Sequence, residues 1–338
     1  MKHAKFKWAG KKALVTGAGG FIGSHLVEYL AAQGAHVRAM VRYNSRGTYG
    51  WLQNQPITKK SNIHMLQGDL RDSETVLRAF EDVEYVFHLG AMISIPYSYV
   101  NPWEVEAVNV TGTLNVLNAC RRNGIKKLVH TSTSEVYGTA LYVPIDEKHP
   151  LQAQSPYSAT KIAADKLVES HVCSFSVPAV TVRPFNTYGP RQSARAVIPT
   201  IIVQLLRGSH ISIGSLSPTR DFTYVDDTVR GFVLAAQSSD ETNGKVINLG
   251  TGEEISINDL AHLLSRLVGG KDLSIKKDSG RIRPKNSEVH RLCSNNKLAR
   301  KLLGWKPSYS LREGLQSTIN WLKVNSDDYK RAQAEYVI

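Results

Sequence analysis

The stretch KALVTGAGGFIGSHLVEYLAAQG, residues 12–34, indicates how the N-terminal half of the chain folds. Residues 12–16 are apolar enough for a buried strand, and residues 21–33 repeat apolar side chains at helical spacing until Gly34 ends the pattern. The glycines between them permit a tight turn and a close approach of the backbone to a ligand. A strand, a glycine-rich turn and a helix in this order predict a dinucleotide site, because the N-terminus of the helix attracts a pyrophosphate.

Strand and helix patterns continue to alternate beyond this stretch. A helix is expected to begin at Ser155-Pro156, since serine is a favourable N-cap and proline fits the first helical turn. Repeated strand–helix units predict an α/β fold with a Rossmann-type doubly wound parallel sheet covered by helices on both faces. Further strands are expected at 36–41, 63–67, 85–89, 126–129, 179–183 and 245–252, and further helices at 102–123, 257–268 and 311–324.

Turns and Pro/Gly punctuation become more frequent after Arg183. We therefore expect an NAD(P)-binding Rossmann domain at residues 1–183 and a smaller C-terminal substrate-binding lobe at 184–338. Residues 221–252 are expected to return to the first domain, because the pattern at 245–252 predicts one more strand of the main sheet.

Composition bounds the class of protein. The chain has 338 residues, of which 42% are hydrophobic and 21% charged, so it can bury a large core and does not have the composition of a disordered chain. It contains no apolar run long enough for a membrane span, and its basic first residues lack the apolar run of a secretory signal. Three widely spaced cysteines fit neither a disulfide framework nor a zinc site, so no metal and a reducing cytoplasmic location are expected, with Cys120 in the core.

The formal net charge of +13 suits either nucleic acid or a polyanionic small molecule. The basic residues are scattered, without the basic and aromatic repeat of an RNA-binding module. Most of the charge is therefore interpreted as a solvated surface, with a few arginines left for a specific ligand, and neither a nucleic acid nor a membrane is expected as a partner.

The glycines follow the spacing Gly17-x-x-Gly20-x-x-Gly23, and the run Gly-Gly-Phe-Ile-Gly resembles the extended branch of the short-chain dehydrogenase/reductase superfamily. The family more often has Ala where Gly90 stands. The resemblance implies cofactor contacts from Gly17, Gly20, Phe21, Ile22, Gly23, Asp69, Leu70, Leu89 and Ala91.

The residues after the second strand bear on the choice of cofactor. A carboxylate normally stands there and binds the ribose diol of NAD, whereas this chain has Arg42, Ser45 and Arg46. These side chains could hold the 2′-phosphate of NADP. The alternative is that both arginines are solvated and NAD binds without the acid.

Tyr157 and Lys161 form a Tyr-x-x-x-Lys pair that shares one helix face. A neighbouring ammonium favours the phenolate and so lowers the pKa of the phenol, which can then take a proton from a sugar hydroxyl. By chance such a pair is usually an ordinary surface pair, but downstream of this glycine motif it resembles the catalytic pair of the superfamily, which also contacts the cofactor. The resemblance implies that Thr133 binds the hydroxyl that Tyr157 deprotonates.

Glu135 lies in TSTSEVYG, residues 131–138, directly after a predicted buried strand. It could be a solvent-facing loop carboxylate. The triplet Thr133-Ser134-Glu135 resembles that of nucleotide-sugar 4,6-dehydratases of the GDP-mannose type, in which the glutamate removes the C5 proton. Ser134 completes the candidate catalytic set, although it cannot supply the separate acid that an aspartate gives in the dTDP-glucose enzymes. UDP-glucuronate decarboxylases carry the same triplet, and 4-epimerases share the scaffold, so both remain alternatives.

The C-terminal third adds candidates for substrate binding. "RPFNTYGPRQ", "RDFTYVDD" and "RIRP" resemble family segments that contact the diphosphate, whereas Tyr224 to Asp227 are expected to be structural. Each arginine could instead form a surface salt bridge. The candidates are Asn186, Arg191, Arg220 and Arg283.

Short segments further resemble the bacterial dehydratases that act on nucleotide-linked N-acetylglucosamine in legionaminic acid pathways. The resemblance implies a cytoplasmic enzyme of cell-surface polysaccharide biosynthesis that acts on UDP- or GDP-GlcNAc with a tightly bound NADP or NAD regenerated in each turnover. It also implies a homodimer through the helices that begin near residues 102 and 155, whose apolar residues could equally serve the monomer core. A non-catalytic NADP-binding sensor is disfavoured, because a sensor has no need of Thr133, Tyr157 and Lys161 together.

Overall fold

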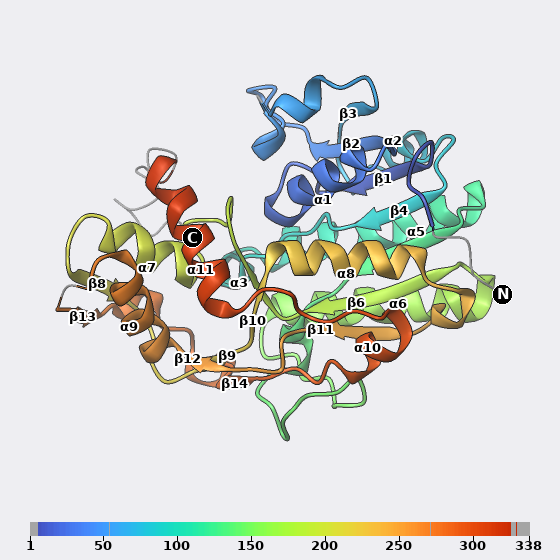
Figure 1. The fold of residues 1–338 in the computed structure, drawn as a ribbon. Coiled ribbons are helices and arrows are strands. Elements are labelled where there is room, and N and C mark those ends of the chain that lie inside the picture. Colours follow the sequence, from blue (N-terminus) through green and yellow to red (C-terminus); the bar gives the residue numbers. More distant parts are fainter. Residues whose placement is uncertain (1–5, 54, 271, 326–328, 330–338) are drawn as a thin grey trace.

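The computed structural model describes residues 6–53, 55–270, 272–325 and 329. Within these residues a parallel sheet of seven strands forms the centre of the larger part of the molecule, in the order β11-β6-β5-β4-β1-β2-β3 (Figure 1). The order reverses beside β1, which is the position where sheets of this kind bind ligands beyond the carboxyl ends of their strands. The strands are β1 (Lys12–Thr16), β2 (His36–Arg42), β3 (Ile63–Gly68), β4 (Tyr85–His88), β5 (Lys127–Thr131), β6 (Ala179–Pro184) and β11 (Val246–Leu249).

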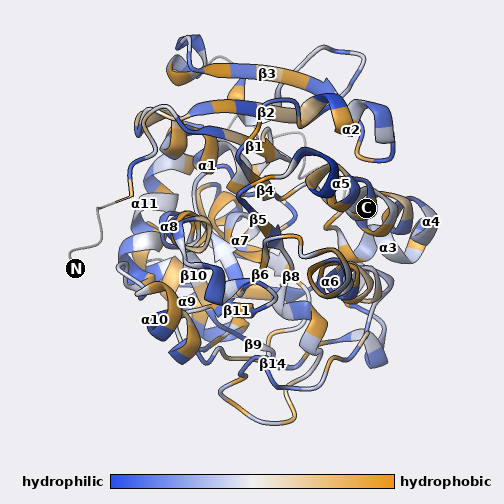
Figure 2. Cartoon of the chain, turned by 90° about the vertical axis from the view of Figure 1, so that its right-hand side faces the viewer, coloured by the Kyte–Doolittle hydropathy of each residue, from blue (hydrophilic) through white to orange (hydrophobic). Residues whose placement is uncertain are grey.

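Helices cover both faces of this sheet, as Figure 2 shows with α8 and α1 on one side and α5 and α6 on the other. Successive side chains of a strand point to opposite faces, so Val15 packs in the core under α1 and α8 while Leu14 packs in the core under α2, α5 and α6. The doubly wound α/β fold is thus confirmed. The helices are α1 (Phe21–Ala32), α2 (Ser73–Ala79), α3 (Ile95–Val100), α4 (Pro102–Glu106), α5 (Gly112–Asn123), α6 (Pro156–Phe175) and α8 (Val225–Gln237).

The single helix expected at 102–123 is interrupted by a π-helical turn, Ala107–Thr111, between α4 and α5. Asn109 in this turn is buried; its side-chain oxygen accepts a hydrogen bond from the Met92 backbone N–H (2.8 Å), and its amide donates to the Met92 carbonyl (3.0 Å). The widened turn therefore coincides with a polar anchor for the segment after β4, as π-helical turns often do near functional sites. Cys120 and Leu117 are in the core, while Trp103 and Leu114 are exposed.

The chain after β6 builds a smaller body beside the carboxyl edge of the sheet and returns once to the sheet, where β11 pairs with β6 (Figure 1). The division of the chain at residue 183 stays a prediction. No helix in the described ranges is both long and apolar enough to cross a membrane. The helices of this part are α7 (Val197–Leu205), α9 (Ile257–Val268), α10 (Lys297–Leu303) and α11 (Leu311–Val324). The strand groups are β7 (Asn186–Tyr188) with β10 (Phe222–Tyr224), β8 (His210–Ile213) with β13 (Ser274–Lys277), and β9 (Thr219–Arg220) with β12 (Ile255–Ser256) and β14 (Arg291–Leu292).

Candidate active site

A cavity of about 1670 Å³ opens at the carboxyl ends of β1, β4, β5 and β6. It is large enough for more than one small molecule, since single-ligand pockets usually measure about 300–1,000 Å³. Most of the predicted site residues line it, whereas Ser45, Arg46, Asp69, Leu70 and Lys161 do not. The predicted residues that do line it are Gly17, Gly20, Phe21, Ile22, Gly23, Arg42, Leu89, Ala91, Thr133, Ser134, Glu135, Tyr157, Asn186, Arg191, Arg220 and Arg283.

The glycine turn between β1 and α1 leaves no room for side chains. Gly17 has a φ of +68°, and a Cβ there would lie 2.8 Å from the backbone nitrogen of Gly90. A Cβ on Gly23 would lie 2.2 Å from the carbonyl oxygen of Gly17. The turn is therefore folded back on the first turn of α1, and its glycines leave the space beside the N-terminus of that helix free of side chains, as the binding of a pyrophosphate requires.

Gly90 follows β4 and lies against the side chain of Leu70. A Cβ on Gly90 would lie 2.6 Å from Cδ1 of Leu70, a buried side chain that reaches this position from the turn after β3. Leu70 thus contacts the wall of the cofactor site from behind without lining the cavity.

The residues after β2 and β3 form ion pairs of their own. Arg42 lines the cavity and pairs with Glu104 of α4 at 3.3 Å, with most of its side chain exposed. Asp69 pairs with Arg71 at 2.6 Å, and this hydrogen bond lowers the pKa of the Asp69 carboxyl. Arg42 is therefore placed to meet a ligand phosphate, whereas Asp69 is already satisfied by its neighbour.

The cavity residues fit a dinucleotide. The glycine turn excludes side chains and leaves a cradle beside the start of α1 that an added Cβ would fill. Elsewhere in the cavity, the buried side-chain oxygen of Asn186 has no hydrogen-bond partner among the described residues, so a donor from a bound ligand would satisfy it.

Tyr157 lies in the first turn of α6, which begins after the predicted N-cap Ser155, and the structure adds a capping box between Ser155 and Ser158. The phenol is buried, and the Thr133 side chain lies close enough to favour its ionised form. Burial raises the pKa of Tyr157 and outweighs this opposing effect of Thr133. The dominant effect on the free phenol is thus opposite in sign to the one expected from a neighbouring lysine, because removal from water disfavours the phenolate.

Lys161 lies one helical turn beyond Tyr157 and is buried. Its ammonium donates to the backbone carbonyl of Thr131 at 2.7 Å, at the end of β5. Burial lowers the pKa of Lys161 to about 8, and the charge of Asp165 opposes that shift. The lysine therefore holds the end of the strand that carries Thr133, in addition to placing a cation near the phenol.

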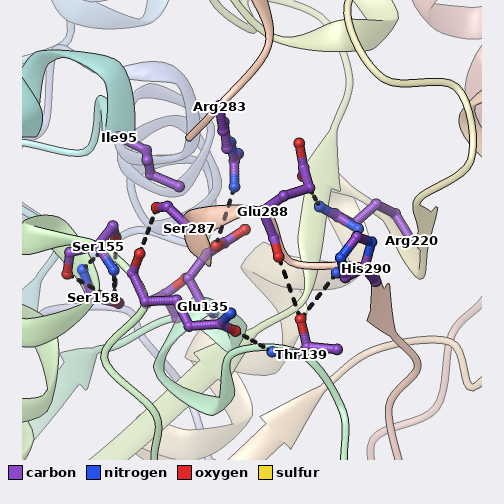
Figure 3. Close-up of polar contacts among 12 residues, drawn as sticks. Ile95, Glu135, Thr139, Ser155, Ser158, Arg220, Arg283, Ser287, Glu288 and His290 are labelled. Atoms are coloured by element: carbon purple, nitrogen blue, oxygen red, sulfur yellow. Dashed lines mark hydrogen bonds and ion pairs between the residues drawn. The ribbon is translucent and has the colours of Figure 1, made fainter. Parts of the chain in front are cut away.

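Glu135 lies in the short 3-10 helix Ser134–Tyr137 that follows β5, together with the buried Ser134. Thr133 caps this turn, since its hydroxyl accepts a hydrogen bond from the Glu135 backbone N–H at 3.2 Å. The carboxylate of Glu135 is almost buried and forms an ion pair with Arg283 at 3.6 Å, as Figure 3 shows.

A second ion pair lies beside the first. Arg220 is buried and pairs with Glu288 at 3.6 Å (Figure 3). It also donates to the backbone carbonyl of Thr219 at 2.9 Å. Burial lowers the pKa of Arg220, although the carboxylate of Glu135 opposes that effect. Glu288 was not predicted as a site residue; its only sequence signal is its place five residues after Arg283.

Arg191 occupies a different position from the other candidate arginines. Its guanidinium donates to Glu28 at 2.9 Å and to the Ser24 hydroxyl at 3.2 Å, both on α1. It therefore fastens the segment after β7 to the helix that follows the glycine turn, while still lining the cavity.

These elements define the class of protein. A doubly wound sheet, a glycine turn and Tyr157 at the same cavity, with Lys161 one turn further along the same helix, are the arrangement of an extended short-chain dehydrogenase/reductase. Residues 14–318 match the family described as GDP-mannose 4,6 dehydratase, and the chain belongs to this family of nucleotide-sugar dehydratases and epimerases. The family expected from the sequence is thus confirmed.

Known relatives include both reaction types. The chain is 33% identical over 323 residues to a putative UDP-glucose 4-epimerase of Methanocaldococcus jannaschii, covering 93% of this chain and 99% of the relative. It is 32% identical over 331 residues to the dTDP-D-glucose 4,6-dehydratase of Mus musculus, covering 96% and 92% of the two chains. Its fold matches DesIV, a dTDP-glucose 4,6-dehydratase of Streptomyces venezuelae solved with NAD and TYD bound, with a TM-score of 0.83, 26% identity, and 95% and 99% of the two chains covered. The chain is therefore an enzyme of the nucleotide-sugar dehydratase and epimerase superfamily, whose cofactor is NAD(P).

Proposed function

We propose that this enzyme is a nucleotide-sugar 4,6-dehydratase that converts an NDP-hexose, UDP- or GDP-linked GlcNAc, to the 4-keto-6-deoxy sugar. The observation that carries the proposal is Glu135. Its carboxylate lines the same cavity as Tyr157 and Thr133, and it is held inside by Arg283 rather than turned to solvent. A base at this place is what a dehydratase needs beyond the oxidation of C4.

The cofactor would lie against the glycine turn, with Arg42 favouring the 2′-phosphate of NADP over the diol of NAD. When bound, NAD(P) accepts the hydride from C4 and returns it to C6 within one turnover. The residues predicted to hold it beside the turn are Arg42, Ser45, Arg46, Asp69, Leu70, Leu89, Ala91, Tyr157 and Lys161.

Thr133 and Tyr157 act at the C4 hydroxyl. The Thr133 hydroxyl orients the substrate, and the Tyr157 oxygen takes the proton from O4 as the C4 hydrogen departs. The buried ammonium of Lys161 makes the phenolate less costly, because an opposite charge in a site removed from water acts more strongly than in water.

Glu135 acts at C5 and C6. The new C4 ketone acidifies the C5 hydrogen, and the Glu135 carboxylate removes it as a proton. The C5 electron pair forms the C5–C6 double bond as the C6 hydroxyl leaves, and Glu135 passes the proton it has taken to that hydroxyl, so that water is released. When C6 regains the hydride, C5 takes a proton from solvent through Glu135, and Tyr157 releases to solvent the proton that it took from O4, which restores both groups. Ser134 is buried in the same turn and has no acidic proton to give, which leaves both proton transfers to Glu135.

The diphosphate of the substrate would meet Asn186, Arg220 and Arg283. Arg220 and Arg283 are now paired with carboxylates at 3.6 Å each, distances at which a phosphate can compete for the guanidinium. Arg191 is predicted to act on the substrate less directly, since Glu28 and Ser24 hold its guanidinium. We also propose a homodimer, since Trp103 and Leu114 are exposed on the helices from which the sequence predicts a dimer surface.

Two other reactions on this scaffold are the alternatives. A 4-epimerase is supported by the similarity to the Methanocaldococcus jannaschii protein, and a UDP-glucuronate decarboxylase by the Thr133-Ser134-Glu135 triplet. Purified enzyme incubated separately with UDP-GlcNAc, GDP-GlcNAc, GDP-mannose and UDP-glucuronate distinguishes the three by mass spectrometry and NMR. Loss of one water supports the dehydratase, loss of carbon dioxide indicates the decarboxylase, and an unchanged mass with an inverted C4 indicates the epimerase.

The variant Glu135→Gln tests the role of the carboxylate directly. Because an amide cannot take the C5 proton, dehydration is expected to fall by about 10²–10⁴-fold, the range for loss of a general acid–base group. Exchange of the C5 hydrogen with deuterated solvent is expected to stop, while cofactor binding stays intact. Glu253→Gln makes the same change at an exposed position and is expected to behave as the parent enzyme. Normal C5 exchange in Glu135→Gln would remove Glu135 from the mechanism.

A further inference from the structure

Asp165 is a buried carboxylate on the helix that carries the catalytic pair. It follows Lys161 by four residues and Tyr157 by eight, so the three side chains lie along one face of α6. The side chain is 4% exposed, although aspartate is rarely buried without a partner. Neither the proposed reaction nor the family comparison accounts for it.

Three groups from two neighbouring strands meet the Asp165 carboxylate. Arg183 of β6 donates to it at 2.8 and 3.1 Å, and the Ser132 hydroxyl, just beyond β5, donates at 2.8 Å. His130 of β5 lies 3.4 Å from its other oxygen. Asp165 therefore joins α6 to the two strands whose carboxyl ends border the cavity.

The contact with Ser132 bears on the site, because Ser132 directly precedes Thr133. The Lys161 ammonium donates a hydrogen bond at 2.7 Å to the backbone carbonyl of Thr131, the residue before Ser132. Two groups on α6, Lys161 and Asp165, thus hold consecutive residues of the chain that leads to Thr133. Both contacts lie directly before Thr133, which lines the same cavity as Tyr157.

The charges around Asp165 keep it ionised. Burial alone would raise its pKa, but His130 and Arg183 outweigh burial and lower the pKa of Asp165 to about 2. Burial lowers the pKa of His130, so its ring is neutral near pH 7, and the ring of His88, itself deprotonated by burial, lies 5.6 Å from it. Asp165 therefore carries a full negative charge over the range in which the enzyme can work.

Other charged groups lie further out in the same network. Arg183 also donates to the Tyr137 hydroxyl at 2.9 Å, and the Glu147 carboxylate acts on Arg183 from the loop that follows β5. Glu135 acts on Tyr157 from the cavity side. Burial lowers the pKa of Lys161, and the negative charge of Asp165 is the main effect that raises it.

We propose that Asp165 is a positioning residue for C4 oxidation: it holds Ser132, and through it the neighbouring Thr133, beside Tyr157 at the cavity. This inference rests on the roles proposed above for Tyr157, Lys161 and Thr133. Asp165, the third ionisable side chain on this face of α6 after Tyr157 and Lys161, thus supports the reaction without contacting substrate or cofactor.

The variant Asp165→Asn tests the charge. The negative charge of Asp165 raises the pKa of Lys161 and that of Tyr157, so its removal lowers both. Activity requires a protonated lysine and a phenol that can lose its proton. Both limbs of the pH profile of kcat are therefore expected to move to lower pH by about one to two pH units, the size of a unit-charge interaction about one helical turn away at an intermediate dielectric.

Glu169→Gln is the matched control, because it makes the same carboxyl-to-amide change on α6 in an exposed ion pair with Lys166. Its pH profile is expected to coincide with that of the parent. A merely structural role for Asp165 would lower activity at every pH without moving the limbs, so the profile separates the two explanations.

Ser132→Ala tests the positioning without a change of charge and leaves Arg183 paired with Asp165 in case Asp165→Asn does not fold. It is expected to lower kcat about tenfold or more with KM within about twofold and with the limbs of the profile in place, since small displacements of reacting groups cost rate more than binding. Melting temperature and NADPH binding confirm that each variant is folded.

Tyr157→Phe separates this inference from the proposed function. If Tyr157→Phe keeps full activity, the proposed reaction roles fail and the inference with them. A second outcome would refute the role of Asp165 alone. In that outcome Tyr157→Phe is inactive, Ser132→Ala keeps the parental kcat, and any folded Asp165→Asn keeps the parental pH profile. The roles proposed for Tyr157, Lys161 and Thr133 then stand, and Asp165 has no positioning role.

Discussion

Asp227 offers the sharpest test of which residues in the "RDFTYVDD" run are structural. It lies in the first turn of α8, is 1% exposed, and is expected from the sequence to be structural. Its carboxylate accepts hydrogen bonds from the backbone N–H groups of Ser308 at 2.8 Å and Tyr309 at 3.1 Å. Arg230 donates to the other oxygen at 2.6 Å. Asp227 therefore anchors the segment that leads into α11, whose Trp321 lines the cavity.

Asp227→Ala leaves two backbone N–H groups without their acceptor. A buried donor left unpaired costs about 1–3 kcal/mol, and the lower end applies to each of these two because Ser308 and Tyr309 are exposed and water can reach them. The contribution of Arg230 is discounted because its side chain is one-third exposed. The free energy of unfolding is therefore expected to fall by about 2 kcal/mol. At about 2 °C per kcal/mol for a chain of this size, Tm falls by about 4 °C.

Differential scanning fluorimetry and urea unfolding measure this change, and steady-state kinetics at a temperature well below both Tm values measure function. Asp226→Ala is the control: Asp226 is exposed and accepts a hydrogen bond from Tyr309 at 3.3 Å, so its loss is expected to change stability by less than about 0.5 kcal/mol. A Tm for Asp227→Ala within about 1 °C of the parent would refute the reasoning. Loss of activity at unchanged Tm would instead assign Asp227 to ligand binding.

Two further predictions concern the cofactor. Gly23→Ala is expected to abolish dinucleotide binding, because the new Cβ would lie 2.2 Å from the Gly17 carbonyl oxygen, and fluorescence titration with NADPH and NADH measures this binding. Gly208→Ala, with nothing within 4 Å of the added Cβ, should bind as the parent does. Tight binding by Gly23→Ala would contradict the assignment of the turn to the cofactor. Arg42→Ala is expected to weaken NADPH about 10–100-fold, the worth of a charged hydrogen bond, and to leave NADH unchanged. An equal loss of affinity for NADPH and NADH would show that Arg42 does not contact the 2′-phosphate.

The local parts of the fold follow from the sequence because they rest on short-range periodicity. The expected bounds of the helices at 257–268 and 311–324 coincide with α9 and α11. The glycine turn and the capped start of α6 are likewise set by neighbours in the chain. The π-helical turn at Ala107–Thr111 was not predictable, because it depends on Asn109 meeting Met92 from another segment.

The sequence by itself therefore determined the family, the individual strands, the dinucleotide turn and the Tyr157–Lys161 pair, which are specified by local patterns and motifs in the chain. Only the tertiary structure decided the partners of the charged groups: Glu135 with Arg283, Arg191 with Glu28, and Lys161 with the carbonyl of Thr131. Such pairs join elements far apart in sequence, and no periodic pattern specifies them. They form where the sheet order brings strand ends together, and burial there makes an unpaired charge too costly to persist.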